Sequence, residues 1–163
     1  MAVSGTDVLY HMTGGAANSD PNLSLGGTIS NTQVALTLHD LFDAVSPTEA
    51  LAGDTEYRAI DVKNNHSTDT LFSAVLWVSG LTTSTSTVIA LAFDATGTQS
   101  IVNETTAPTG LTFTSPISKA TGIALGNIAA AGTKRIWVRR TVTAAAGVLS
   151  ADAGALTVGG ATA

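Results

Sequence analysis

The chain of 163 residues contains no cysteine. This absence excludes thiol catalysis, thiolate metal ligands and disulfide bonds, and it fits any compartment. Charged residues account for 12% of the chain, about half the usual share. The net charge of −5 argues against a general nucleic-acid-binding protein, because phosphate contacts require a basic field. No apolar run reaches the about 18 residues of a membrane-spanning helix, so we expect no membrane partner.

Motifs for catalysis and metal binding are also missing. The chain has no Gly-x-Ser-x-Gly nucleophile elbow, no His-Glu-x-x-His pair, no calcium-loop pattern and no phosphate-binding glycine fingerprint. Its histidines are His11, His39 and His66. The oxygen-rich turns near His39 and His66 are typical of exposed turns as well as of calcium sites. The sequence therefore predicts a protein that is not an enzyme and that holds no cofactor or metal.

What the chain does contain is a series of short β-branched and apolar segments separated by turn residues. About eight to ten short strands of this kind indicate an all-β fold, a single β-sandwich of immunoglobulin-like or jelly-roll-like type. Ser46 and Glu49 have the spacing of a capping box, which predicts a short helical turn after residue 46. The expected strands cover residues 34–38, 56–63, 71–78, 88–93, 99–102, 111–113, 123–125, 134–142 and 156–158.

Residues 1–30 differ from the rest because closely spaced glycine, asparagine and proline residues interrupt any regular period. We predict that they form an extended N-terminal arm, either disordered or ordered against a partner. The first seven residues lack the basic and apolar regions of a secretory signal, so we expect no export by that route. The β-sandwich domain is predicted to span residues 31–163.

The run from Lys134 to Arg140, Lys-Arg-Ile-Trp-Val-Arg-Arg, holds four of the seven basic residues. In a regular strand, Arg135, Trp137 and Arg139 share one face. Because Trp and Arg dominate interface hot spots, the run predicts an interface. Two alternatives stay open: Trp137 belongs to the core with the arginines paired to nearby carboxylates, or the run forms a glycan-binding groove. The predicted interface residues are Lys134, Arg135, Trp137, Arg139 and Arg140, with Tyr10, Leu23 and Leu25 from the arm.

Charge is unevenly distributed along the chain. Nine of the twelve acidic residues precede residue 70, whereas four of the seven basic residues lie in residues 134–140. This asymmetry suits head-to-tail pairing of like subunits. It suits ion pairs within one sandwich equally well.

Two kinds of resemblance sharpen these expectations. A strand ending in Val62-Lys63-Asn64-Asn65, facing one that follows Gly126-Asn127-Ile128 and Gly132, resembles the pattern of immunoglobulin-like modules. Three blocks also resemble segments common in structural proteins of tailed bacteriophages, and the likeness covers roughly residues 31–158. The blocks are residues 51–58 with 62–66, residues 103–113, and residues 126–128 with Gly132 and 136–142.

The phage resemblance implies a structural virion component without enzymatic activity. Small all-β proteins of this kind decorate or cement the head, so the implied location is the capsid surface after synthesis in the host cytoplasm. The implied partners are the major capsid protein and copies of the chain itself, as a homo-oligomer with a trimer as one option. A tail or baseplate component and a glycan-binding attachment module are the alternatives.

Overall fold

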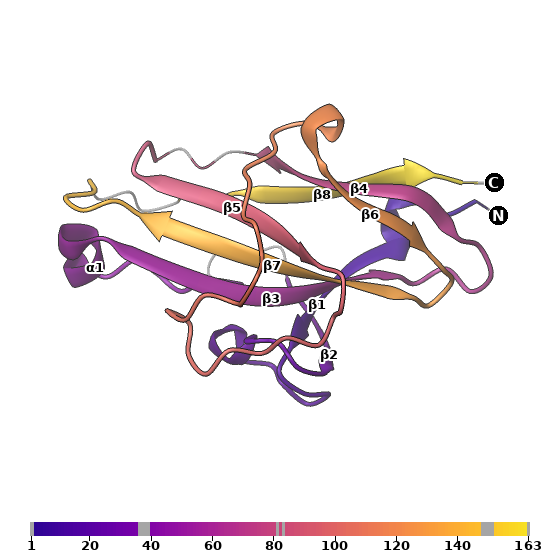
Figure 1. Ribbon diagram of the computed structural model, residues 1–163, viewed down its shortest axis with the longest axis horizontal. Coiled ribbons are helices and arrows are strands. Elements are labelled where there is room, and N and C mark those ends of the chain that lie inside the picture. Colours follow the sequence, from indigo (N-terminus) through magenta and orange to yellow (C-terminus); the bar gives the residue numbers. More distant parts are fainter. Residues whose placement is uncertain (1, 36–39, 81, 83, 148–151, 163) are drawn as a thin grey trace.

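The computed structural model describes residues 2–35, 40–80, 82, 84–147 and 152–162. Two antiparallel sheets face each other as a sandwich, which confirms the all-β prediction (Figure 1). The large sheet has the strand order β2-β1-β3-β7-β5, and the small sheet has the order β6-β4-β8. The large-sheet strands are β1 (Val8–Thr13), β2 (Ile29–Gln33), β3 (Asp54–Asn64), β5 (Thr87–Asp94) and β7 (Thr133–Val142). The small-sheet strands are β4 (Leu71–Gly80), β6 (Ile123–Ile128) and β8 (Ala155–Ala161).

The helical elements are short. The α-helix α1 (Pro47–Ala52) lies at one end of the sandwich, opposite the β3–β4 connection (Figure 1). The capping box predicted for it is confirmed, because Ser46 Oγ accepts from the Glu49 amide and the Glu49 carboxylate accepts from the Ser46 amide. Single 3₁₀ turns are η1 (Gly5–Asp7), η2 (Pro21–Leu23) and η3 (Lys119–Thr121). None of the described helices is long and apolar enough to cross a membrane.

The centre of the large sheet is the long antiparallel pair of β3 and β7. Their register aligns Glu56 with Arg140 and Lys63 with Thr133. The segment leading into β7 is held by Asn64, whose amide donates to Gly132 O at 3.0 Å and whose Nδ2 donates to Ile128 O at 3.0 Å. The facing strands expected from the immunoglobulin-like pattern are therefore neighbours in one sheet.

The extended arm predicted for residues 1–30 is not confirmed. Residues 8–13 form β1, which pairs with β3 from Val8↔Asn64 to Met12↔Ile60. The predicted domain boundary at residue 30 falls inside β2. The breaker residues that suggested an arm occupy the β1–β2 connection, where Gly14, Gly15, Gly26 and Gly27 have positive φ angles. Such residues mark tight turns as readily as disorder.

The apolar core divides into two layers. The first lies between the sheets and includes Ile60, Leu76, Leu91 and Ile136. The second lies on the opposite, outer face of the large sheet, where Tyr57, Ala59, Ala92 and Trp137 pack together. Because these side chains are buried on an outer sheet face, another segment of the chain must pack over them.

The cover is the long connection between β5 and β6, residues 95–122. It passes β2 and returns over β3, β7 and β5 toward η3 (Figure 1). Its Ile101, Leu111 and Phe113 pack on the outer cluster around Trp137. The strands predicted at residues 99–102 and 111–113 are therefore wrong, because their apolar alternation belongs to a covering loop. This loop makes isolated bridges from Ser100 to Gly26 in the β1–β2 connection and from Thr114 to Leu91 on β5.

The predicted strand at residues 34–38 is not found at Val34 and Ala35, which follow the end of β2. Residues 36–38 lie outside the described residues. The remaining expected strands correspond to β3, β4, β5, β6, β7 and β8.

Candidate functional site

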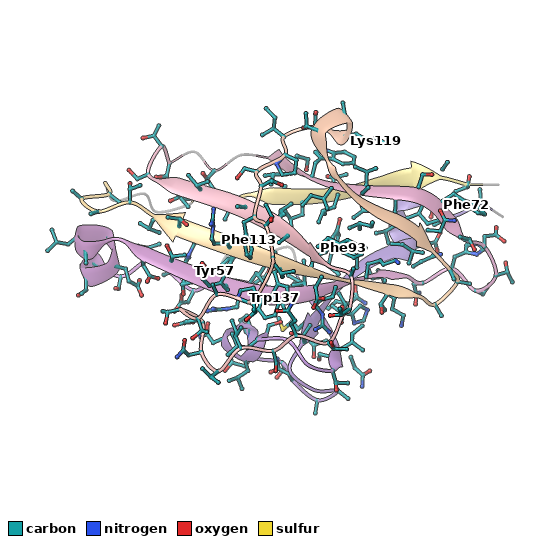
Figure 2. The ribbon with its side chains drawn as sticks, viewed as in Figure 1. Tyr57, Phe72, Phe93, Phe113, Lys119 and Trp137 are labelled. Carbon is teal, nitrogen blue, oxygen red and sulfur yellow. The ribbon has the colours of Figure 1, made fainter. Side chains whose placement is uncertain are left out.

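The basic strand β7 is buried in the middle of the large sheet. Trp137 is 0% exposed and packs with Tyr57 and Ala59, under the connection that carries Phe113 (Figure 2). The Tyr57 and Phe113 rings meet edge to face with centroids 5.4 Å apart. The indole is therefore part of a core layer, as in the first alternative left open by the sequence. It is not available as an interface hot spot or as a platform for stacking a sugar.

Arg135, on the same face of β7, is held by a carboxylate directly opposite it on β3. Its Nε and Nη2 donate to the two oxygens of Asp61 at 2.8 and 2.9 Å, and Nη2 also donates to Gly27 O at 2.7 Å. The side chains of Arg135 and Asp61 are 3% and 5% exposed. A bidentate, desolvated pair of this kind fixes geometry between strands and is not free to bind a partner.

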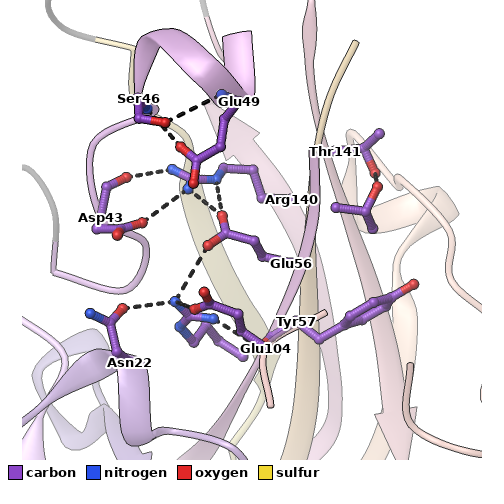
Figure 3. Close-up of polar contacts among 11 residues, drawn as sticks. Asn22, Asp43, Ser46, Glu49, Glu56, Tyr57, Glu104, Arg140 and Thr141 are labelled. Atoms are coloured by element: carbon purple, nitrogen blue, oxygen red, sulfur yellow. Dashed lines mark hydrogen bonds and ion pairs between the residues drawn. The ribbon is translucent and has the colours of Figure 1, made fainter. Parts of the chain in front are cut away.

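The opposite face of β7 contributes Arg140 to a second buried ion-pair network, drawn in Figure 3. Arg140 Nε donates to Glu56 Oε2 at 2.7 Å, and Arg140 Nη2 donates to the same oxygen. Arg140 Nη1 donates to Asp43 O at 2.6 Å, and Nη2 lies 3.3 Å from Asp43 Oδ1. This guanidinium therefore ties the loop before α1 to the centre of the large sheet.

Arg58, two residues beyond Glu56 on β3, extends the network. Its Nη2 donates to Asn22 Oδ1 at 2.8 Å and to Glu104 Oε2 at 2.5 Å, and lies 3.5 Å from Glu56 Oε1. The Arg58 side chain is 0% exposed. Because Asn22 belongs to η2 and Glu104 to the β5–β6 connection, Arg58 fastens both segments to β3.

The ring of Phe42 lies beside both guanidinium groups. Its centre is 4.9 Å from Arg140 Cζ and 5.4 Å from Arg58 Cζ. Burial raises the pKa of Glu56, although Arg140 and Arg58 act in the opposite direction. The network thus joins five segments distant in the sequence around one desolvated carboxylate, an arrangement that fixes tertiary structure.

The remaining predicted interface residues are dispersed. Arg139 Cζ lies 5.2 Å from the centre of the Phe113 ring and Lys134 Nζ lies 5.9 Å from that of Phe93. Tyr10 packs against the core between the sheets, and its hydroxyl donates to Leu156 O at 3.4 Å. Burial raises the pKa of Tyr10 to about 12. Leu23 is 58% exposed on η2, and Leu25 is half-buried.

A cavity of about 730 Å³ lies near α1. Its lining is mainly apolar and comes from both sheets, from α1 and the loop before it, and from the β4–β5 and β7–β8 connections, with Ile60, Val78 and Leu156 among the contributors. Small-molecule sites have volumes in this range. Arg140 and Asp43, which line one wall, are already paired with each other, so they offer no free polar anchor for a ligand.

A smaller hollow of about 360 Å³ lies beside β7, lined by Asp61, Asp94, Lys134 and Arg135. The negative charges of the two carboxylates and the positive charges of the two basic side chains nearly cancel there, so the hollow has little net charge. Asp94 Oδ1 accepts from the amides of Thr96 and Gly97, so it serves the turn that follows β5.

No metal-binding cluster is found in the described part of the chain. No set of three or more His, Asp or Glu side chains there is placed to hold a metal ion. His11 is buried, with Nδ1 2.9 Å from Ser30 O, and His66 lies in the β3–β4 turn. His39, which the sequence placed in a possible oxygen-rich site, lies outside the described residues.

The residues that sequence reasoning missed are the buried carboxylates and their partners. The sequence predicted no role in a buried ion-pair network for Glu56, Arg58, Asp61 or Glu104. One signal was present: charged residues at alternate positions of a strand with apolar neighbours on both faces cannot all reach solvent. The pairing partner of each could not be read from the sequence, because it depends on register.

Comparisons with known proteins do not assign the chain to a group. No protein-family model matches it. Neither the curated proteins nor the solved structures give a significant match.

Proposed function

We propose that this chain is a structural protein of a tailed-bacteriophage virion that decorates and stabilises the exterior of the capsid. It would do so through contacts with the major capsid protein and with copies of itself. The proposal extends the resemblance of three sequence blocks to phage structural proteins, and it includes no enzymatic activity and no cofactor.

The observation that carries the proposal is the way these three blocks meet. The first block supplies most of β3, the third supplies most of β7, and these strands pair from Asp54↔Val142 to Lys63↔Thr133. The second block contains Glu104, which binds Arg58, and Phe113, which packs on Tyr57. The blocks thus form one packed unit, so the resemblance concerns a coherent part of the fold.

The chemistry of this unit fits a scaffold. Arg58 and Arg140 of this unit both pair with the buried Glu56, and Arg58 also pairs with Glu104 of the β5–β6 connection. Large apolar side chains are exposed elsewhere, among them Val102 at 88% and Ile117 at 62%. Exposed apolar groups on a chain poor in charge favour contact with other proteins.

The test is a cryo-EM map of the particle from which the chain comes. Decoration predicts density for the eight-stranded sandwich repeated over the capsid lattice. Quantitative mass spectrometry of purified heads should then give a copy number that matches the lattice. Heads that lack the protein, or density confined to the tail, would refute capsid decoration.

A further inference from the structure

The core between the two sheets is incomplete at the end of the sandwich that carries α1. The cavity of about 730 Å³ lies there. Its lining includes Ile60, Val78 and Val138, which are buried side chains with exposures of 1–2%. We call these three residues the floor. Because protein interiors leave few voids larger than a water molecule, a cavity that reaches the floor is not ordinary core packing.

The walls of the cavity are apolar side chains that remain partly accessible. Ile89 of β5 and Leu156 of β8 come from opposite sheets, and Phe42 comes from the loop before α1. All three pack against the buried core, yet each is only half-buried. An apolar group that filled the space would remove this area from water, which is favourable.

Several polar groups of the lining are bonded to the chain itself. Thr82 Oγ1 donates to Thr87 O at 2.9 Å, and Arg140 Nη1 donates to Asp43 O at 2.6 Å (Figure 3). Burial raises the pKa of Tyr10, on another part of the lining, to about 12. A water molecule inside a protein needs about two to four polar partners. The cavity therefore favours an apolar occupant over a polar one.

The lining has a net negative charge. Its described acidic residues are Asp40, Asp43 and Asp152, and its described basic residue is Arg140. Arg140 also donates to the buried Glu56, so its charge is shared with a further carboxylate. A cleft lined by negative charge repels anions. The cavity is thus suited to an uncharged molecule and not to a carboxylate.

We propose that this cavity binds a small uncharged molecule with a single alkyl chain, such as a fatty alcohol. The chain would lie between the sheets with its end against the floor, and its hydroxyl would stay at the solvent side near α1. Stacked sheets lie about 10 Å apart, so the space between them fits a slender chain better than a fused ring system.

The size of the cavity agrees with this class of ligand. Binding sites for small molecules have volumes of about 300–1,000 Å³, and an apolar cavity of about 150 Å³ already binds benzene. The affinity would come from apolar burial and shape. The inference does not depend on the virion proposal.

The experiment is a displacement assay on the full chain. N-phenyl-1-naphthylamine, an uncharged dye that fluoresces in apolar surroundings, should bind to the wild type, and 1-decanol should displace it. Across a series from 1-hexanol to 1-decanol, the affinity should increase by about fourfold for each added methylene, because each one is buried between the sheets.

Two variants fill the cavity with a larger side chain. Ile89→Trp on β5 should weaken the binding of 1-decanol by about tenfold or more. Val88→Trp is the matched control, because Val88 is the preceding residue of β5, is 45% exposed and does not line the cavity. Leu156→Trp fills the cavity from β8 and should have the same effect as Ile89→Trp. Circular dichroism and melting temperature establish which variants are folded.

Decanoate tests the charge of the ligand. It should displace the dye at least about tenfold less well than 1-decanol at pH about 7, since its carboxylate meets a negative lining. Asp152→Asn keeps the side-chain oxygen that accepts from the Ser84 amide at 3.0 Å. This variant should reduce the difference between decanoate and 1-decanol by about threefold.

Three results would overturn the binding site. They are a wild type that binds neither the dye nor 1-decanol, binding that is undiminished in the folded cavity-filling variants, or binding that Val88→Trp weakens equally. Decanoate that competes as well as 1-decanol would overturn the assignment of an uncharged ligand. None of these results concerns contacts with a capsid, so the virion proposal is tested separately by the particle map.

Discussion

Replacing Arg140 with methionine tests whether the buried ion-pair network stabilises the fold. The substitution keeps an unbranched apolar stem beside Phe42 but removes the guanidinium that donates twice to Glu56 Oε2. Glu56 is 2% exposed, so its carboxylate would remain desolvated with one cation, Arg58, 3.5 Å away. Breaking a buried pair by removing one partner costs about 3–5 kcal/mol.

Because Arg58 stays in place, we expect the low end of that range, about 3 kcal/mol at pH about 7. For a domain of this size the melting temperature should fall by about 6–12 °C. Urea unfolding followed by near-ultraviolet circular dichroism measures the free-energy change by linear extrapolation. The matched control is Arg139→Met, on the neighbouring residue, which contacts the Phe113 ring and should cost about 1 kcal/mol or less.

The pH dependence follows from the raised pKa of Glu56. Burial already lifts it above the ordinary value of 4.5, and Arg140 is the largest opposing influence. Without Arg140 the pKa rises further, so the native state binds the proton more tightly than the unfolded chain does. Stability then falls as pH rises from below the ordinary pKa through the raised one. The unfolding free energy that Arg140→Met loses relative to wild type should therefore be smaller at pH about 4 than at pH about 7.

The double variant Glu56→Gln/Arg140→Met tests whether the unpaired charge of Glu56 causes the loss of stability in Arg140→Met. Neutralising Glu56 removes the uncompensated charge, so this variant should regain at least about 1 kcal/mol relative to Arg140→Met at pH about 7. The reasoning would be refuted if Arg140→Met lost no more unfolding free energy than Arg139→Met, or if its loss did not depend on pH.

Three further predictions concern the core, the helix cap and a buried hydroxyl. Trp137→Ala should cost about 3–5 kcal/mol in urea unfolding because the side chain is 0% exposed; a loss below about 1 kcal/mol would contradict its place in the core. Ser46→Ala should lower stability by about 1 kcal/mol in thermal unfolding through the lost cap of α1, whereas Ser46→Asp should restore it. The pKa of Tyr10 is raised to about 12 from 10.0, so the native state holds this proton and stability should fall as pH rises between these values. Ultraviolet titration of wild type against Tyr10→Phe should locate that ionisation, and a Tyr10 step near its ordinary pKa would contradict the burial.

Local patterns predicted the fold where strand period, turn residues and caps agree. β3 and β7 combine β-branched residues with polar turns at their ends, and Ser46 with Glu49 predicts the start of α1. The same reasoning failed at residues 99–102 and 111–113. Apolar alternation reports that one side of a segment is buried, and it does so equally for a strand and for a loop lying over a sheet.

In the N-terminal segment the sequence failed to predict strands that the structure contains. Closely spaced glycines suggested an arm, whereas β1 and β2 lie on either side of a connection that uses these glycines for its turns. β1 is a short segment that pairs on one side with β2 and on the other with β3, from Val8↔Asn64 to Met12↔Ile60. Pairing at that separation leaves little trace in local sequence.

By itself, the sequence determined that this chain is an all-β protein poor in charge, with a capped helical turn and a basic strand containing Trp137. Tertiary structure alone decided that Trp137 is buried and that Arg135 and Arg140 pair with Asp61 and Glu56. The physical reason is that strand periodicity assigns side chains to two faces, while burial of each face depends on which distant segment packs over it.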